Sequence, residues 1–268
     1  MRSLEEMLQS LVSLLLLNDA RQEHAVRSFG RASEVAQRLP LVHRTNKPGD
    51  DPAKWLEVLR SRTFAASAPC TGDREKVAGI PRAAYFFVGC GAYPDGLVGF
   101  VLDAPSVLTQ PSSYTPFDSG SIEKHTVPTD PTLAAAWDGP AKDGFLADHV
   151  GLGRELVSFS GPYLASHFYE PLTYVRGGQR SGPDFPAYHG LQCRVGDRRA
   201  WTLEVQVHED VAFGAGGATL IEIVAARPAQ VEDMPDDLVG ITRVASPENE
   251  VLESIAEGIE ARILAEVP

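Results

Sequence analysis

The first forty residues carry apolar side chains at the spacing of an α-helix. Between residues 3 and 17 the apolar positions recur every three or four residues. These positions are Leu4, Met7, Leu8, Leu11, Val12, Leu15 and Leu16. A second, more polar helical stretch at about residues 20–39 ends at Pro40. We therefore expect residues 1–40 to form an N-terminal helical arm, which either contacts a partner or a second copy of the chain, or covers one face of a sheet.

The pattern changes at Leu41, where short apolar runs replace the helical stripe. Runs of β-branched and aromatic residues predict strands at residues 41–45, 83–88, 97–102, 200–207 and 220–225. Helices are predicted at residues 53–62 and 251–267. The strands are short, and the segments between them are too irregular for a doubly wound parallel sheet. This order predicts an α+β domain spanning residues 41–268.

The segment from residue 105 to residue 140 is rich in Pro, Ser, Thr, Gly and Asp and has few apolar clusters. This composition predicts a long surface excursion, and long loops within compact domains are commonly functional. Helical character returns at about residues 147–169, and a Gly- and Pro-containing loop follows at residues 176–186. We expect the whole stretch of about 105–195 to be a long insertion in the α+β domain.

The charge balance bears on possible partners. The chain has 36 acidic and 24 basic residues, a formal net charge of −12, which argues against a broad phosphate-binding surface for nucleic acid. Its three cysteines have no CxxC spacing, which is typical of reduced thiols inside a cell. The apolar run at residues 11–17 is too short to cross a bilayer and follows Glu5 and Glu6 rather than basic residues. We expect a cytoplasmic protein without a membrane partner.

Several common catalytic motifs are missing from the sequence. It contains no GxxxxGK[ST], no HExxH and no GxSxG, and its glycine-rich segments do not form a strand–GxGxxG–helix unit. No two of the seven histidines have metal-ligand spacing on one helical turn, so we expect no metal site. The Asp118-Ser119-Gly120 segment is typical of a polar turn, and a hydrolase with Ser119 as nucleophile is the weakest alternative.

Three of the predicted strands carry polar side chains in a suggestive order. His43, Arg44 and Thr45 end the first strand, Tyr85 lies on an aromatic strand that Tyr93 follows, and Glu204 lies in a strongly alternating segment. In this order the residues resemble the ADP-ribosyltransferase family of the diphtheria-toxin and poly-ADP-ribose-polymerase type, which uses a His-Tyr-Glu set. The resemblance implies a split, mostly antiparallel β core with helices, and NAD⁺ as a substrate.

The resemblance also implies a catalytic set of Glu204, His43 and Tyr85. A carboxylate at Glu204 would stabilise the positive charge that develops on the ribose when the bond to nicotinamide breaks. His43 would hydrogen-bond a ribose hydroxyl, and Thr45 would support the edge of the pocket.

The remaining cofactor contacts would come from two tyrosines and an arginine. Tyr85 and Tyr93 would flank the flat nicotinamide ring. Arg44 would contact the pyrophosphate, because a guanidinium pairs well with phosphate oxygens. Each of these residues also has an ordinary structural explanation, as a core aromatic, a turn residue or a solvated strand position.

Two further segments are similar to those of a group of uncharacterised bacterial proteins. The first is Pro-Phe-Asp-Ser-Gly at residues 116–120, and the second is Arg-Ala-Trp-Thr-Leu-Glu at residues 199–204. The first segment either lines the acceptor or cofactor site or forms a polar turn. The chain differs from polymerase-like transferases in the long insertion between Tyr93 and Glu204, which leaves the acceptor open.

Three functions therefore remain in competition. An ADP-ribosyltransferase would modify a macromolecular acceptor, protein or nucleic acid, and could be a toxin or a bacterial defence effector. An NAD⁺ glycohydrolase would use water as the acceptor. A non-catalytic binding module on a decayed transferase fold would use the N-terminal helices as its partner surface.

Overall fold

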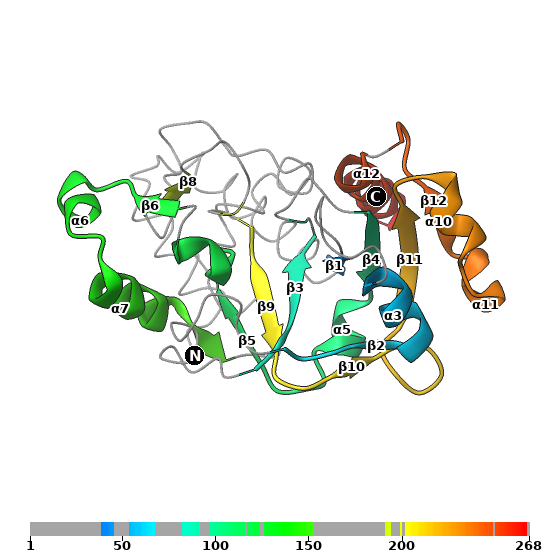
Figure 1. The fold of residues 1–268 in the computed structure, drawn as a ribbon, viewed down its shortest axis with the longest axis horizontal. Helices are drawn as coiled ribbons and strands as arrows, with labels where there is room; N and C mark the ends of the chain where they lie inside the picture. The colour runs from blue at the N-terminus through cyan, green and yellow to red at the C-terminus, as the bar shows by residue number, and fades with distance from the viewer. Residues whose placement is uncertain are drawn as a thin grey trace, which may run out of the picture.

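The computed structural model describes most of the predicted α+β domain (Figure 1). The described residues are 39–45, 54–67, 82–89, 91, 97–115, 117–123, 126–152, 191–193, 199, 202–248 and 250–266. The predicted helical arm of residues 1–40 lies outside them except for its last two residues, and the loop at residues 176–186 and Tyr93 lie outside them too. The predicted domain boundaries stay a prediction.

The centre of the domain is an eight-stranded sheet. In spatial order its strands are β12 (Thr242–Val244), β11 (Leu220–Ala225), β4 (Val98–Leu102), β1 (Leu41–Thr45), β3 (Ala84–Val88), β9 (Glu204–Val207), β5 (Ser112–Thr115) and β7 (Gly151–Leu152). Neighbouring strands are antiparallel except for the parallel pair of β11 and β12. The predicted α+β class with a mostly antiparallel sheet is confirmed.

Short elements surround this sheet. Two two-stranded ribbons pair β2 (Thr63–Phe64) with β10 (Val211–Ala212) and β6 (Thr126–Pro128) with β8 (Leu191–Cys193). The helices are α3 (Lys54–Ser61), α5 (Ala104–Val107), the 3₁₀ helix η1 (Ser119–Glu123), α6 (Pro131–Ala135), α7 (Gly139–His149), α10 (Pro228–Glu232), α11 (Asp236–Val239) and α12 (Val251–Glu266). In the described residues no helix is both long enough and apolar enough to cross a membrane.

The sheet opens between β1 and β3. Strand β1 pairs with β4 along its whole length, from Leu41 opposite Leu102 to Thr45 opposite Val98. Its pairing with β3 covers only Leu41 and Val42. Beyond Val42 the two strands no longer form a regular ladder, so the sheet is split at the end of β1 that carries the predicted site residues.

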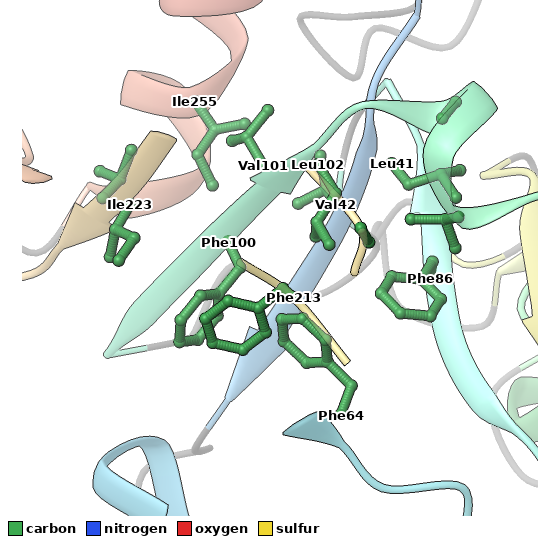
Figure 2. Packing of buried hydrophobic residues seen from close by; sticks show 14 of the residues in the cluster. Leu41, Val42, Phe64, Phe86, Phe100, Val101, Leu102, Phe213, Ile223 and Ile255 are labelled. Carbon is green, nitrogen blue, oxygen red and sulfur yellow. The ribbon is translucent and has the colours of Figure 1, made fainter. Parts of the chain in front are cut away.

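Aromatic residues fill the core on one face of the sheet. Figure 2 shows Phe64, Phe100 and Phe213 gathered on one side of β4 and β1, with ring centroids of Phe64 and Phe100 5.3 Å apart and those of Phe64 and Phe213 5.1 Å apart. Helix α3 contributes the buried Trp55 and Leu59 to the same core. Large aromatic rings bury much apolar area, so this face supplies a large part of the hydrophobic stabilisation.

Helix α12 covers the opposite face at β4, where Figure 2 shows Ile255 approaching the strand. Its buried residues recur at helical spacing, as the sequence predicted for residues 251–267. They are Val251, Leu252, Ile255, Ala256, Ile259 and Ile263. The helix approaches β4 so closely at Gly99 that a Cβ there would overlap the Cδ1 of Ile255 and lie 3.2 Å from the Cγ1 of Val251.

The prediction of a long surface excursion at residues 105–140 is wrong. Strand β5 lies within this segment and belongs to the main sheet, between β9 and β7. Helices α6 and α7 are N-capped by Asp130 and Asp138, whose carboxylates accept backbone N–H bonds from Leu133 and Ala141. Asp and Pro are typical of loops and equally of helix starts, so composition alone could not distinguish them.

The close approach at Gly99 gives a test of the packing. Replacing Gly99 with Val should lower the free energy of unfolding by about 1–3 kcal/mol, because the added side chain forces α12 away from β4. Replacing Gly144 with Ala in α7, where nothing lies within 4 Å of the new Cβ, should instead raise it by about 0.5–1 kcal/mol. Urea denaturation measures both, and a neutral Gly99→Val would contradict this packing of α12.

Candidate functional site

The register of the central strands brings several polar side chains onto one face of the sheet. Glu204 of β9 pairs with Phe87 of β3 on one side and with Thr115 of β5 on the other. Gln206 pairs in the same way with Tyr85 and Ser113. Directly paired residues project to the same side of a sheet. We call the group of Tyr85, Ser113, Thr115, Glu204 and Gln206 the polar face.

The carboxylate of Glu204 is buried and held by several donors. The side chain is 3% exposed. Its Oε1 accepts hydrogen bonds from the Ser119 hydroxyl at 2.5 Å, from the Ser119 backbone N–H at 3.2 Å and from the Gln206 Nε2 at 2.7 Å. Burial penalises a charge unless hydrogen bonds replace the lost water, and these three donors do so.

A second set of hydrogen bonds fixes the amide of Gln206. Its Nε2 also donates to the Oγ1 of Thr115 at 3.0 Å, and its Oε1 accepts from the hydroxyl of Ser113 at 3.0 Å. The Ser113 Oγ lies 2.9 Å from the Nε2 of His208, a half-buried residue just beyond β9. Ser113, Thr115, Glu204 and Gln206 therefore form one connected hydrogen-bond network with Ser119 and His208.

Residues of the 116–120 and 199–204 segments meet at this network. The backbone N–H of Asp118 donates to the carbonyl of Arg199 at 2.9 Å, and Ser119 bonds Glu204 as described. The Asp118 carbonyl also accepts from the Ser121 hydroxyl at 2.7 Å and from its N–H at 3.0 Å, which makes a turn. Residues 118–121 thus form a turn, and Ser119 within this turn borders Glu204.

His43 lies on the other face of the sheet. It pairs with Phe100, and its ring centroid is 4.7 Å from that of Phe64 and 5.5 Å from that of Phe86. Because His43 follows Val42, whose register partner Phe87 pairs with Glu204, the imidazole and the carboxylate project to opposite sides. The structure therefore does not bring His43 and Glu204 together in one pocket, as the resemblance implied.

The imidazole of His43 has a structural contact at the opening of the sheet. Its Nδ1 lies 2.8 Å from the carbonyl oxygen of Tyr85 on β3. A carbonyl can only accept, so Nδ1 carries the proton and donates. Burial among the aromatic rings lowers the pKa of His43 below its usual value of 6.5, and the hydrogen bond to Tyr85 opposes this only in part. The side chain links β1 to β3 where their backbone ladder ends.

The other predicted contacts are divided between the two faces. Thr45 shares the aromatic face with His43 and lies 3.5 Å from the carbonyl of Val98. Arg44, one residue earlier, projects to the same side of the sheet as Glu204. A Cβ at Gly91 would lie 3.1 Å from the Arg44 Cδ, so the arginine stem runs beside that glycine. Tyr93 lies outside the described residues.

Two of the predicted residues, Tyr85 and Glu204, thus belong to the polar face, and Arg44 of β1 projects to the same side of the sheet. The carboxylate could stabilise developing positive charge, and the guanidinium could pair with an anionic group. Within the described part of the chain, no group of three or more His, Cys, Asp or Glu side chains could hold a metal ion.

The hydrogen-bond network that surrounds Glu204 and Gln206 could not be predicted from the sequence pattern. The alternation at residues 202–206 indicated that Gln206 shares a side with Glu204, and the alternative of a solvated strand position is wrong, because both side chains are buried. Ser113 and Thr115 belong to a polar strand that hydrophobic periodicity cannot detect.

Comparisons with known proteins add no relative. No protein-family model matches the chain, and no curated protein is significantly similar to it.

The environment of His43 predicts a pH dependence of stability. Because its pKa is lowered in the folded chain, the unfolded chain binds more protons as the pH falls below about 6.5. The contribution of neutral His43 to the free energy of unfolding is complete above pH 6.5, and it is lost as the pH falls through the lowered pKa of the folded chain. A His43→Asn variant keeps a donor but does not titrate.

Unfolding free energies of the parent and of His43→Asn should therefore converge as the pH falls below 6.5, by up to about 1.4 kcal/mol per pH unit. Urea denaturation between pH 4.5 and 8 measures this. A difference that stays constant over this range would show that His43 is not held neutral by burial.

Proposed function

We propose that the chain is an NAD⁺-dependent ADP-ribosyltransferase whose reacting carboxylate is Glu204, with the dinucleotide bound on the polar face. The observation that carries the proposal is the shared orientation of Tyr85 and Glu204. They lie on neighbouring strands, on one side of the sheet, in diagonal positions. Such positions are about 7–8 Å apart, within reach of one aromatic ligand ring.

The proposed reaction needs a carboxylate beside the ribose. The bond between the ribose C1′ and the nicotinamide nitrogen breaks, and nicotinamide leaves with the bonding electron pair. The positive charge left on the sugar is stabilised by Glu204, which can also accept a proton from the acceptor as it attacks C1′. Tyr85 would stack on the nicotinamide, and Arg44 would pair with the pyrophosphate.

In this proposal neither His43 nor Thr45 contacts the substrate. Both lie on the aromatic side of the sheet, and His43 already donates to the Tyr85 carbonyl. In this scheme His43 acts on the site through Tyr85, by holding the strand that carries it. Tyr93 keeps its predicted role as the second flanking aromatic.

We propose a macromolecular acceptor and a cytoplasmic site of action, as expected of a toxin or defence effector. Incubation with NAD⁺ labelled in the adenosine half, in the presence of a cell lysate, should transfer label to protein or nucleic acid. Release of nicotinamide without labelled macromolecules would instead identify an NAD⁺ glycohydrolase.

A second candidate, a non-catalytic binding module, is favoured by the burial of the network. Glu204, Gln206 and Ser119 are 3%, 0% and 0% exposed, so the network can serve to fix the 116–120 segment to the sheet. In that case the chain would bind no NAD⁺ at millimolar concentration in calorimetry.

Replacing Glu204 with Gln tests the proposal most simply. The amide keeps the size of the side chain but loses its charge, so NAD⁺ turnover should fall about 10²–10³-fold while NAD⁺ affinity is retained. Nicotinamide release measures turnover, and calorimetry measures affinity.

Glu209→Gln is the matched control, because Glu209 is exposed and lies two residues beyond the end of β9. This variant should turn over NAD⁺ at the parent rate. A Glu204→Gln variant as active as the parent would overturn the catalytic assignment.

A further inference from the structure

The hydrogen bonds that connect Ser113, Thr115 and His208 to Glu204 through Gln206 have donors and acceptors that can be assigned in only one way. Thr115 has a single hydroxyl proton, which it donates to the carbonyl of Phe117 at 2.6 Å. Its oxygen is then an acceptor for Gln206. The other proton on the Gln206 Nε2 goes to Glu204, which leaves the Gln206 Oε1 as the acceptor for Ser113.

The same donor count assigns His208. Ser113 has given its only hydroxyl proton to Gln206, so its oxygen can only accept from the His208 Nε2. The chain of donors therefore runs from His208 to Ser113, then to Gln206, and ends at the carboxylate of Glu204. Reversing any link would place two donors or two acceptors face to face.

Gln206 is a polar residue in the interior of the domain. The residue is fully buried, and its chain neighbours Val205 and Val207 pack into the aromatic core on the other face. A buried amide is costly unless every group is paired. Both N–H groups and the carbonyl of Gln206 are paired, and the shortest of the three bonds goes to Glu204.

We infer that Gln206 is a positioning residue for Glu204, fixed in its amide orientation by Ser113 and His208. This inference rests on the proposed function for its catalytic consequence only. Gln206 acts on the carboxylate and does not touch the substrate. It favours the ionised form of Glu204 and fixes the orientation of its carboxylate group.

The test compares variants along the chain of donors. Gln206→Met keeps the length of the side chain and removes the donor, and Ser113→Ala removes the link that orients the amide. Ser121→Ala is the matched control. Ser121 is a buried residue of η1, the helix that also contains Ser119, but its hydroxyl donates to the Asp118 carbonyl and not to Glu204. Thermal unfolding checks that each variant is folded.

The first readout does not depend on activity. ¹³C NMR of carboxyl-labelled glutamate, with the Glu204 signal assigned through Glu204→Gln, follows the titration of this carboxyl. Its midpoint should rise by about one pH unit in Gln206→Met, which is about tenfold in the ionisation constant, and by less in Ser113→Ala. Ser121→Ala should leave it unchanged. A midpoint in Gln206→Met equal to that of the parent would overturn the inference.

The second readout is catalytic. Gln206→Met should lower kcat for NAD⁺ about tenfold with KM little changed, because the substrate contacts are kept. A rise in KM at constant kcat would contradict a positioning role and make Gln206 a binding residue. If the parent does not turn over NAD⁺, the proposed function fails, and the carboxyl titration alone decides the inference.

Discussion

The buried carboxylate of Glu204 is the constraint around which the centre of the sheet is arranged. A charge at 3% exposure is tolerated only with several hydrogen-bond donors, and here they come from two separate parts of the chain. Gln206 supplies one from the same strand, and Ser119 supplies two from the turn that follows β5. The carboxylate thus joins the 116–120 segment to β9.

The two faces of the sheet are stabilised by different interactions. One face packs aromatic rings around Phe64 and Phe100, where the non-directional hydrophobic effect dominates. The other face, over β3, β9 and β5, depends on hydrogen bonds whose donors and acceptors must match in direction. His43 belongs to the first face and Glu204 to the second.

Much of the fold could be predicted from apolar periodicity, and the site could not. The strand at 220–225 and the helix at 251–267 have clear patterns and lie where the sequence predicts them. Strand β5 was missed because its inward-facing serine and threonine are buried by hydrogen bonds rather than by apolar contact. The face of His43 depends on the register of β1 with β3 and β4, which involves residues more than forty positions apart.

The central claim is that the polar face is where NAD⁺ binds. Two-dimensional NMR during an NAD⁺ titration tests it directly, with assignments for the side-chain amide of Gln206 and the rings of Tyr85 and His43. If NAD⁺ binds there, we expect saturable shifts of the Gln206 amide and the Tyr85 ring and a smaller, secondary change at His43. Shifts confined to the aromatic face, or none at millimolar NAD⁺, would contradict it.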